Sequence, residues 1–259
     1  MPNGWHPLRE CVVLPDDEPQ SHGEWPDLPR CNRSACVKRL SFEHWSDPLC
    51  IWALVGQPKL DRIVEELGDK LDVEHHVVPV FGSIPWRFRE GPWASAGVEG
   101  RVEATRTIAA QHGRSDVSGE CWVRDCPASS WSAGVAVEAV LLLEREGRVP
   151  RGTGSAYHRL VRERFFVTAA NVAKRDVQLA IAEELGIERA GMEAHLDDGS
   201  AIGALWEDIR RKEQLCIQGS PTFVFEGGRA MLYGNFAYGI LRATVDELVR
   251  GLDVGASRC

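Results

Sequence analysis

The sequence contains no apolar run of the roughly 18 residues that a membrane-spanning helix needs. It also lacks a basic excess, since 30 Lys and Arg stand against 38 Asp and Glu, a formal net charge of −8. A general nucleic-acid binder usually carries a basic stripe, so this composition argues against that class. The first residues, MPNGWHPLRECVVLPDDEPQ, lack the basic start and apolar stretch of a secretory signal. We therefore expect a cytoplasmic protein with no membrane or nucleic-acid partner.

What is present is an ordinary globular composition, with 44% hydrophobic and 26% charged residues in 259. This length suits one large domain or two small ones. In a reducing cytosol, the eight cysteines are more often free, metal-bound or catalytic than cross-linked. The segments CNRSAC and CWVRDC could together supply the four thiolates of a zinc site. Because Cys126 is followed by proline, as in a turn that leads into a helix, we predict no metal.

Hydrophobic periodicity predicts a strand, a helix and a second strand within residues 35–98, after an irregular extension over residues 1–34. Residues 35–45 alternate as a strand does, and residues 71–82 are rich in valine. Between them the apolar residues recur at helical spacing until Gly68, which ends the predicted helix. A strand, a helix and a strand over this length form a βαβ unit with a parallel pair.

The following residues, 99–215, show helical patterns and no convincing strand. The strand signal returns in residues 216–250, where PTFVFEGG and AMLYG predict a hairpin and an amphipathic helix follows. Residues 251–259 are predicted as a tail. The sequence therefore predicts an α/β protein of order βαβ, helical insertion, ββα.

Three separated segments resemble the DsbA-like branch of the thioredoxin superfamily, which includes FrnE-type proteins and 2-hydroxychromene-2-carboxylate isomerases. SDPLCIWA is similar to its active-site segment, and CPASSWSAGVAVEAV is similar to its first inserted helix. CIQGSPTFVFEGGRAMLYGN is similar to its segment with a cis-proline and two terminal strands. The resemblance covers roughly residues 35–250 and implies a thioredoxin fold with a helical insertion.

The resemblance also implies a site in which Cys50 begins a helix opposite a cis Ser220–Pro221 bond. Backbone groups beside such a proline can pair with an extended peptide or with glutathione. The implied substrate-binding residues lie in the active-site segment and the proline loop, and they are Trp52, Ala53, Ser220, Pro221 and Thr222. Five further tryptophans either line an apolar groove near this site or belong to the core: Trp45, Trp86, Trp93, Trp122 and Trp131.

Cys50 is expected to be a nucleophilic thiolate, because a helix N-terminus offers free N–H groups and a partial positive charge. The alternative is a small buried hydrophobic side chain. His44, near the end of the same strand, is expected either to tune the thiolate or to be a solvated histidine.

Ala53 departs from the Cys-x-x-Cys pattern of dithiol enzymes. Its methyl group removes the second thiol that would resolve a mixed disulfide, so an outside thiol would be needed. Among the other cysteines we expect Cys126 to be the best candidate for a second thiol, because it opens the helical insertion. Cys216 lies near the proline loop, whereas Cys36 should lie at the far end of the sheet.

We expect a thiol-dependent oxidoreductase in which Cys50 acts with a low-molecular-weight thiol, such as glutathione, or with a small organic substrate. The first alternative is a glutathione-dependent isomerase or transferase of the kappa or hydroxychromene-carboxylate type. The second is a non-enzymatic protein adaptor, for which Cys50 would be dispensable. No bound cofactor is expected, and self-association as a homodimer is left open.

Overall fold

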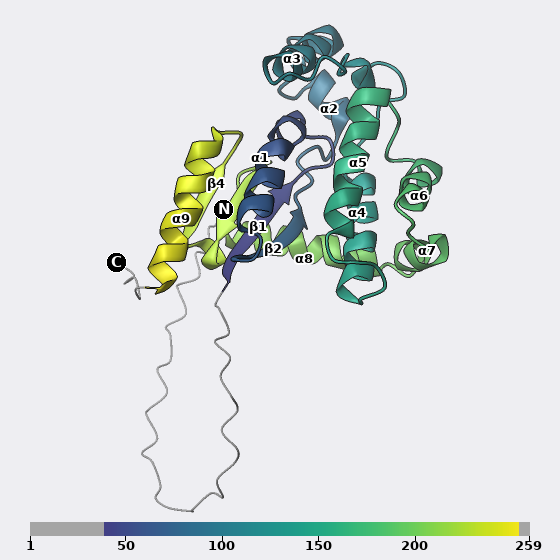
Figure 1. The fold of residues 1–259 in the computed structure, drawn as a ribbon. Helices are drawn as coiled ribbons and strands as arrows, with labels where there is room; N and C mark the ends of the chain where they lie inside the picture. Colours follow the sequence, from purple (N-terminus) through teal and green to yellow (C-terminus); the bar gives the residue numbers. More distant parts are fainter. Residues whose placement is uncertain (1–38, 254–259) are drawn as a thin grey trace, which may run out of the picture. The chain divides into compact units, whose positions relative to one another are not determined.

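The computed structural model describes residues 39–253, and its elements follow the predicted order (Figure 1). The strands are β1 (Leu40–Ser46), β2 (Leu71–Val77), β3 (Thr222–Phe225) and β4 (Ala230–Tyr233). The first helices are α1 (Ile51–Leu67), α2 (Ile84–Arg89), α3 (Gly97–Gln111), α4 (Trp131–Arg145) and α5 (Thr153–Thr168). The later ones are α6 (Arg175–Glu184), α7 (Arg189–Asp197), α8 (Ser200–Gln214) and α9 (Tyr238–Asp253). Short 3-10 turns occur at Glu120–Trp122 and Glu226–Gly228.

The four strands form one sheet in the order β2-β1-β3-β4. β1 and β2 are parallel, with Leu40 opposite Leu71 and Ser46 opposite Val77. β3 is antiparallel to β1 and to β4. The parallel pair needs a crossover, which α1 provides, whereas the antiparallel pair is joined by a short turn. This topology confirms the predicted α/β thioredoxin fold with a helical insertion.

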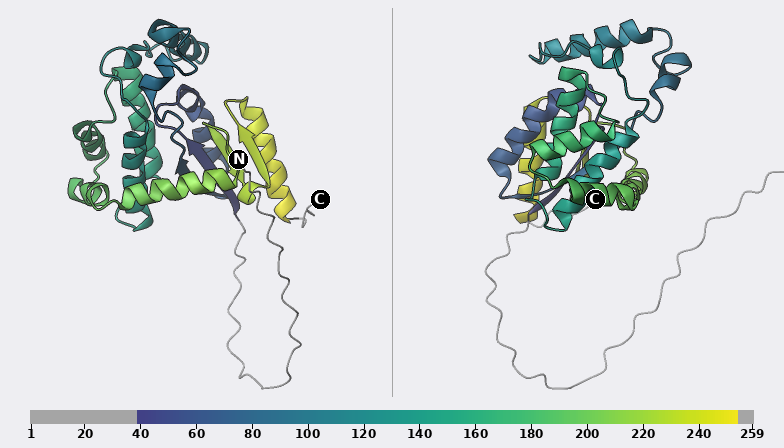
Figure 2. Two further views of the ribbon diagram at one scale, coloured as in Figure 1. Left: turned by 180° about the vertical axis from the view of Figure 1, so that it is seen from behind. Right: turned by 90° about the vertical axis from the view of Figure 1, so that its right-hand side faces the viewer.

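The two faces of the sheet are covered by different helices. On one face, Phe42 stacks on the rings of Phe223 and Phe225 and packs in a cluster with residues of α1 and α9. On the other, Trp45 packs with residues just after α8, which crosses the sheet in Figure 2. Each such fully buried large side chain contributes about 1.5–3 kcal/mol. Alternation along β1 therefore fixes which side of the sheet each helix covers.

The insertion is helical, as predicted, and packs around α4, which contacts α5, α7 and α8. Two short helices, α2 with six residues and α7 with nine, were not predicted because they show too little hydrophobic periodicity. α2 instead has a local start signal, since the Ser83 hydroxyl accepts a hydrogen bond from the Trp86 N–H and Pro85 follows the cap. In Figure 1, α2 and α3 lie at the end of the sheet where β1 leads into α1.

The last helix extends past a predicted boundary, and other predicted boundaries lie outside the described residues. α9 continues to Asp253, past the boundary predicted at residue 250. The predictions for residues 1–34 and for residues 254–259 lie outside the described residues, as does that for Cys36.

Candidate functional site

Cys50 lies where β1 turns into α1, and local hydrogen bonds shape this turn. Cys50 is the N-cap residue of α1, and its carbonyl accepts the hydrogen bond of the Leu54 N–H at 3.1 Å. Its own N–H donates to the Asp47 carbonyl at 3.2 Å. Ala53 follows in the first helical turn and is 3% exposed. The sequence prediction of a cysteine at a helix start is confirmed.

The proline loop meets this helix start directly. The Ser220–Pro221 peptide bond is cis, as the resemblance implies. The Cys50 thiol donates to the Ser220 carbonyl at 3.3 Å, and the Ser220 hydroxyl accepts from the Asp47 N–H at 2.9 Å. Within the same loop, the Thr222 hydroxyl donates a hydrogen bond to the Gly219 carbonyl at 2.8 Å. One of the two backbone groups expected to pair with a ligand is therefore occupied by Cys50 itself.

The surroundings of Cys50 favour the protonated thiol, so the nucleophilic thiolate expected from the sequence stays a prediction. Cys50 is 4% exposed, and burial raises the pKa of its thiol above the usual value. The Asp47 carboxylate raises it further, while the Ser220 hydrogen bond, the Ala53 N–H and the Arg162 charge oppose the rise. Desolvation outweighs these opposing effects because the buried thiolate would lose its water. Burial thus favours the protonated form of the Cys50 thiol, which donates a hydrogen bond to the Ser220 carbonyl.

Asp47 organises the site and was missed as a functional residue at the sequence level, although it precedes proline in SDPLCIWA. Its fully buried carboxylate accepts from the Leu49 and Val80 N–H groups, both at 2.6 Å, and from the Ser130 hydroxyl at 2.7 Å. Burial raises the pKa of Asp47 to about 6, against the effect of these hydrogen bonds. Ser130, in the PASS turn before α4, thus ties the insertion to the helix start.

A second missed residue, Arg162 of α5, lies beneath the thiol. It is 2% exposed and donates to the Gln57 side-chain oxygen at 3.1 Å, to the Asp47 carbonyl at 3.4 Å and to the Ser46 hydroxyl. Burial lowers its pKa to about 10, so it stays charged at neutral pH. No sequence pattern marks this arginine, because its role depends on how α5 packs against α1.

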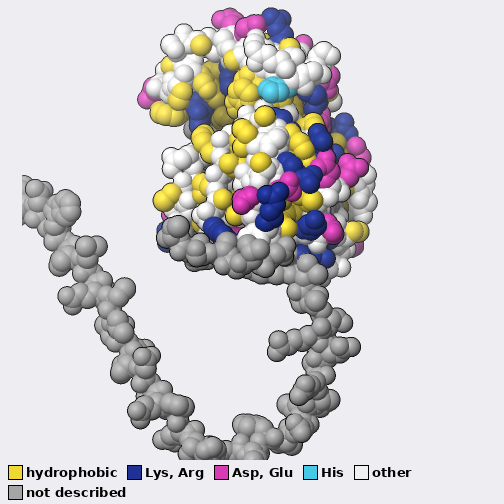
Figure 3. Space-filling view, turned by 60° about the vertical axis from the view of Figure 1, so that its left-hand side comes forward, with side chains coloured by type: hydrophobic (Ala, Val, Ile, Leu, Met, Phe, Trp, Pro, Cys, Tyr) yellow, Lys and Arg dark blue, Asp and Glu magenta, His cyan; other side chains and the backbone are white. Residues whose placement is uncertain are grey.

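A cavity of about 310 Å³ opens above Cys50. It is lined by residues far apart in the sequence, including Cys50, Trp52, Arg87, Trp93, Arg101, Gln218, Ser220 and Tyr233. Figure 3 shows this region as a hollow below the upper helices, where hydrophobic and basic side chains gather. Among the predicted substrate-binding residues, Trp52 and Ser220 line the cavity. Ala53, Pro221 and Thr222 are buried and stand behind its wall.

Two other predicted site residues lie elsewhere. His44 is 4% exposed and meets the rings of Phe223 and His75 at 5.1 and 5.6 Å, so it is not a solvated histidine. Burial lowers its pKa well below the usual value. The Cys126 thiol is half-buried, does not line the cavity above Cys50, and has a pKa raised to about 11 by burial. A role for Cys126 as a second thiol stays a prediction.

The tryptophans divide between the two expected roles. Trp93 lines the cavity, and Trp122 is 3% exposed behind it at a ring distance of 5.2 Å. Trp45 lies on the far side of the sheet, stacked on His76 at 4.2 Å. Trp86 and Trp131 are each 46% exposed. Of these five tryptophans, only Trp93 lines the cavity above Cys50.

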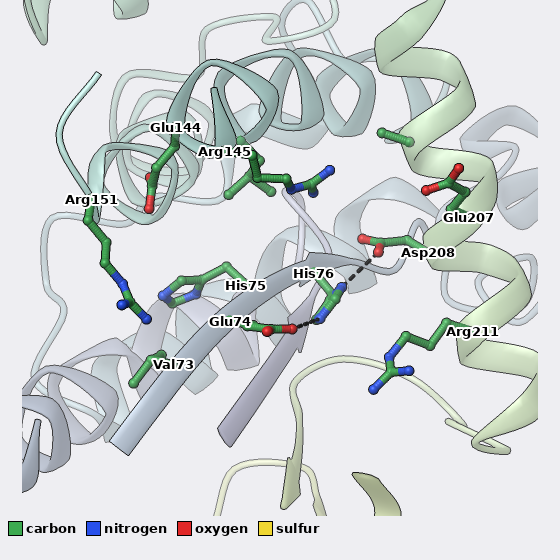
Figure 4. Close-up of a pocket in the computed structure, with 12 residues that line it drawn as sticks. Val73, Glu74, His75, His76, Glu144, Arg145, Arg151, Glu207, Asp208 and Arg211 are labelled. Carbon is green, nitrogen blue, oxygen red and sulfur yellow. Dashed lines mark hydrogen bonds and ion pairs between the residues drawn. The ribbon is translucent and has the colours of Figure 1, made fainter. Parts of the chain in front are cut away.

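A separate cavity of about 540 Å³ lies between β2, α4 and α8. Figure 4 shows His76 there between Glu74 and Asp208, with the His76–Asp208 contact at 2.7 Å. Glu43 is 1% exposed, lies 3.8 Å from His76 and is paired with Arg211. Within residues 39–253, no group of three or more His, Cys, Asp or Glu side chains is arranged to hold a metal ion. The cysteine pair at 31–36 falls outside those residues.

Comparison with known proteins supports the fold and adds a functional relative. Residues 133–245 match the DSBA-like thioredoxin domain. The ClpXP adapter protein SpxH of Halalkalibacterium halodurans is 26% identical over 189 residues, which are 73% of this chain and 59% of that protein. The SpxH of Shouchella clausii is 24% identical over 235 residues, which are 88% of this chain and 74% of that protein. The chain thus spans about three-fifths of the first of these relatives.

Solved structures show the same fold. A putative protein disulfide isomerase from Nitrosomonas europaea aligns with a TM-score of 0.66 at 18% identity, covering 82% of this chain and 98% of that one. The cytosolic disulfide reductase DsbM from Pseudomonas aeruginosa aligns with a TM-score of 0.58 at 23% identity, covering 83% and 98%. No helix in the described part of the chain is long and apolar enough to cross a membrane.

Proposed function

We propose that this chain is a cytoplasmic protein adaptor on a DsbA-like thioredoxin fold, which presents partner polypeptides to a ClpXP protease. The observation that carries the proposal is the state of Cys50. Its thiol is buried, donates to the Ser220 carbonyl and has a raised pKa, and Ala53 stands where a resolving thiol would be. A thiol in this state should exchange slowly, because thiol exchange proceeds through the thiolate.

Two further observations support the adaptor function. The curated relatives named above are ClpXP adapter proteins, and their similarity extends over most of this chain. The cavity above Cys50 is open and bordered by the exposed rings of Trp52 and Tyr233, which are 39% and 59% exposed. Exposed aromatic side chains beside a cavity are typical of surfaces that bind proteins. The four cysteines in the described part of the chain are all free thiols, which fits a reducing compartment.

The proposal is tested with an inactive ClpP that retains the proteins delivered to it. Cells that make the full-length chain and cells that lack it are compared by quantifying the retained proteins. We expect at least one protein to be retained only when the chain is present, and to be retained equally with Cys50→Ser. A retained set that does not change when the chain is removed would contradict the adaptor function.

A second candidate function is thiol exchange at Cys50 with glutathione or another small thiol. The contact between the thiol and the cis-proline loop favours it, because this is where the fold places a reactive cysteine. Incubation with oxidised glutathione, followed by peptide mass mapping of the wild type and Cys50→Ser, separates the two functions. The adaptor proposal predicts no adduct on Cys50 at neutral pH, whereas a rapid adduct at that residue would favour the enzyme.

A further inference from the structure

Arg87 and Arg101 carry positive charges into the cavity above Cys50. We propose that these two arginines form a carboxylate-binding pocket, which anchors an acidic side chain of an extended partner polypeptide. The inference rests on the proposed adaptor function and names the chemistry by which its partner is recognised. Arg87 comes from α2 and Arg101 from α3, so the pocket is made where these helices cover the end of the sheet.

Neither guanidinium has a carboxylate partner within residues 39–253. Arg87 donates to the Val80 carbonyl at 2.5 Å, and the Arg101 Nε is buried without any hydrogen-bond acceptor. By contrast, Arg114 nearby in sequence is paired with both Asp116 and Glu163. Both arginines are only partly exposed, and a desolvated charge without a counter-ion costs free energy. An anion that binds from outside would explain why two arginines without carboxylate partners face the same cavity.

Aromatic rings hold the two arginines in place. The Arg101 guanidinium lies 4.4 Å from the Trp93 ring and 4.6 Å from the Trp122 ring. The Arg87 guanidinium lies 5.1 Å from the same Trp93 ring and 4.9 Å from that of Phe81. Stacking uses the faces of a guanidinium and leaves its N–H groups available to a planar carboxylate. Trp93 therefore supports both halves of one anion-binding group.

The acidic groups around the cavity are already satisfied or absent. Asp47 attracts Arg87 through space, but its carboxylate accepts four hydrogen bonds from backbone N–H groups and Ser130. Cys50 is a neutral thiol that donates to Ser220. Burial lowers the pKa of Arg101 to about 10, which leaves it charged at neutral pH. The cavity thus has a net positive charge that the described part of the chain does not neutralise.

The rim of the cavity indicates a polypeptide as the occupant. Trp52 on α1 and Tyr233 on β4 border the opening and are 39% and 59% exposed. Tyr233 approaches the proline loop so closely that a Cβ on Gly219 would lie 2.9 Å from its hydroxyl oxygen. A free ion would occupy the arginines and leave both rings uncovered, whereas an extended acidic segment would contact arginines and rim together.

The test uses the full-length chain and pairs of labelled peptides with blocked termini. Each pair shares one sequence and differs only in a central Glu or Gln, and binding is measured by fluorescence anisotropy over a set of flanking sequences. We expect Glu peptides to bind and Gln peptides to bind about ten- to hundredfold more weakly, as for hydrogen bonds to a charged group. Added salt should weaken the binding of the Glu peptides.

Variants then assign the effect to the pocket. Arg101→Gln and Arg87→Gln should each remove the preference for Glu, and Arg101→Lys should restore only part of it because lysine lacks the planar fork. Arg210→Gln is the matched control, since Arg210 also stacks on a tryptophan, Trp206, but pairs with Glu213 on α8. The thermal midpoint of Arg101→Gln should stay the same or rise, because an unpaired buried charge is removed. This confirms that the variant is folded.

Each outcome decides the proposal. Equal binding of Glu and Gln peptides, no binding by any acidic peptide, or unchanged preference in Arg101→Gln would overturn it. Competition by free glutathione or acetate at the concentration at which the peptide binds would also overturn it, in favour of a small-anion site. If acidic peptides bind as expected but ClpP retains no protein, the adaptor function fails and the pocket stands. Retention that survives Arg101→Gln overturns the pocket and leaves the adaptor function intact.

Discussion

Cys50 occupies the position at which a thioredoxin fold presents a nucleophile, yet its surroundings favour the neutral thiol. Burial has the largest effect on its pKa, and the hydrogen bonds with Ser220 and the Ala53 N–H and the charge of Arg162 do not compensate for it. The thiol then serves as a donor to the Ser220 carbonyl, a group that would otherwise pair with a ligand.

The state of Cys50 predicts slow alkylation at neutral pH. Because its pKa lies above the ordinary value of 9.0, the reactive thiolate should become abundant only in more alkaline solution. The rate of iodoacetamide labelling at Cys50, followed by peptide mass mapping, should still be rising at pH 9.0. Exposed Cys216 provides a comparison in the same sample. A labelling rate at Cys50 that has already levelled off at neutral pH would contradict this state of the thiol.

His76 predicts a stability that depends on pH. Burial opposes its charge, but the hydrogen bond to Asp208, the ion pair with Glu74 and the field of Glu43 raise its pKa to about 9. Since this folded-state pKa exceeds 6.5, the imidazolium stabilises the fold fully below pH 6.5, and that contribution is lost as the pH rises through about 9. The size is on the order of 1–3 kcal/mol.

The comparison of the wild type with His76→Gln in urea unfolding checks this sign. The difference in unfolding free energy should be largest below pH 6.5 and should shrink above pH 9. An NMR titration of the His76 ring should give a midpoint near 9. A midpoint below 6.5, or a difference between the two proteins that grows with pH, would be inconsistent with the network of carboxylates around this histidine.

At the scale of elements, three loops donate hydrogen bonds to the Asp47 carboxylate. Asp47 receives N–H groups from the start of α1 and from the segment after β2, and a hydroxyl from the turn before α4. These hydrogen bonds join the core of the fold to its insertion. The site above Cys50 is thus positioned by a residue that does not line it.

Asp47→Asn should loosen this junction. An amide has one acceptor oxygen where the carboxylate has two, so at least one buried donor loses its partner, which costs about 1–3 kcal/mol. Chemical denaturation of the variant should show this loss, and hydrogen exchange should speed up at Val80 and Leu49. Asp69→Asn, at an exposed position with no hydrogen bond to its side chain among the described residues, is the control. Equal stability of both variants would contradict the role of Asp47.

Elements with strong local signals were predictable from the sequence. The helix ending at Gly68 and the hairpin around Glu226–Gly228 have the apolar spacing and glycines that define them. His75 and His76 point to opposite faces, as adjacent strand residues must. The short helices α2 and α7 were missed because six and nine residues hold too few apolar repeats to show a period.

The chemistry of the site was less predictable than its position. Cys50, Trp52 and Ser220, which belong to local sequence motifs, line the cavity, and their roles there stay predictions. The burial that raises the pKa of Cys50 could not be predicted, because it depends on tertiary packing around the helix start. Arg87, Arg101 and Arg162 have no local signature, since their roles come from contacts between helices far apart in sequence.

At the scale of the whole molecule, a fold shared with disulfide enzymes is combined with a site that lacks their second thiol. Arg87 and Trp93, which precede the insertion, and Arg101, which lies within it, line the cavity above Cys50, and the exposed rings of Trp52 and Tyr233 border its opening. We infer that the molecule recognises a polypeptide through the positive charge of this cavity and the exposed aromatic rings at its rim. Binding then needs no covalent step, and Cys50 contributes to the wall of the cavity.

The most direct test of this account compares three chains in the inactive ClpP assay: the wild type, Cys50→Ser and Arg101→Gln. The account predicts equal retention of the chain-dependent protein by the wild type and Cys50→Ser, and a loss of about tenfold or more in Arg101→Gln. Retention that is lost in Cys50→Ser and unchanged in Arg101→Gln would contradict it, because the thiol would then carry the function.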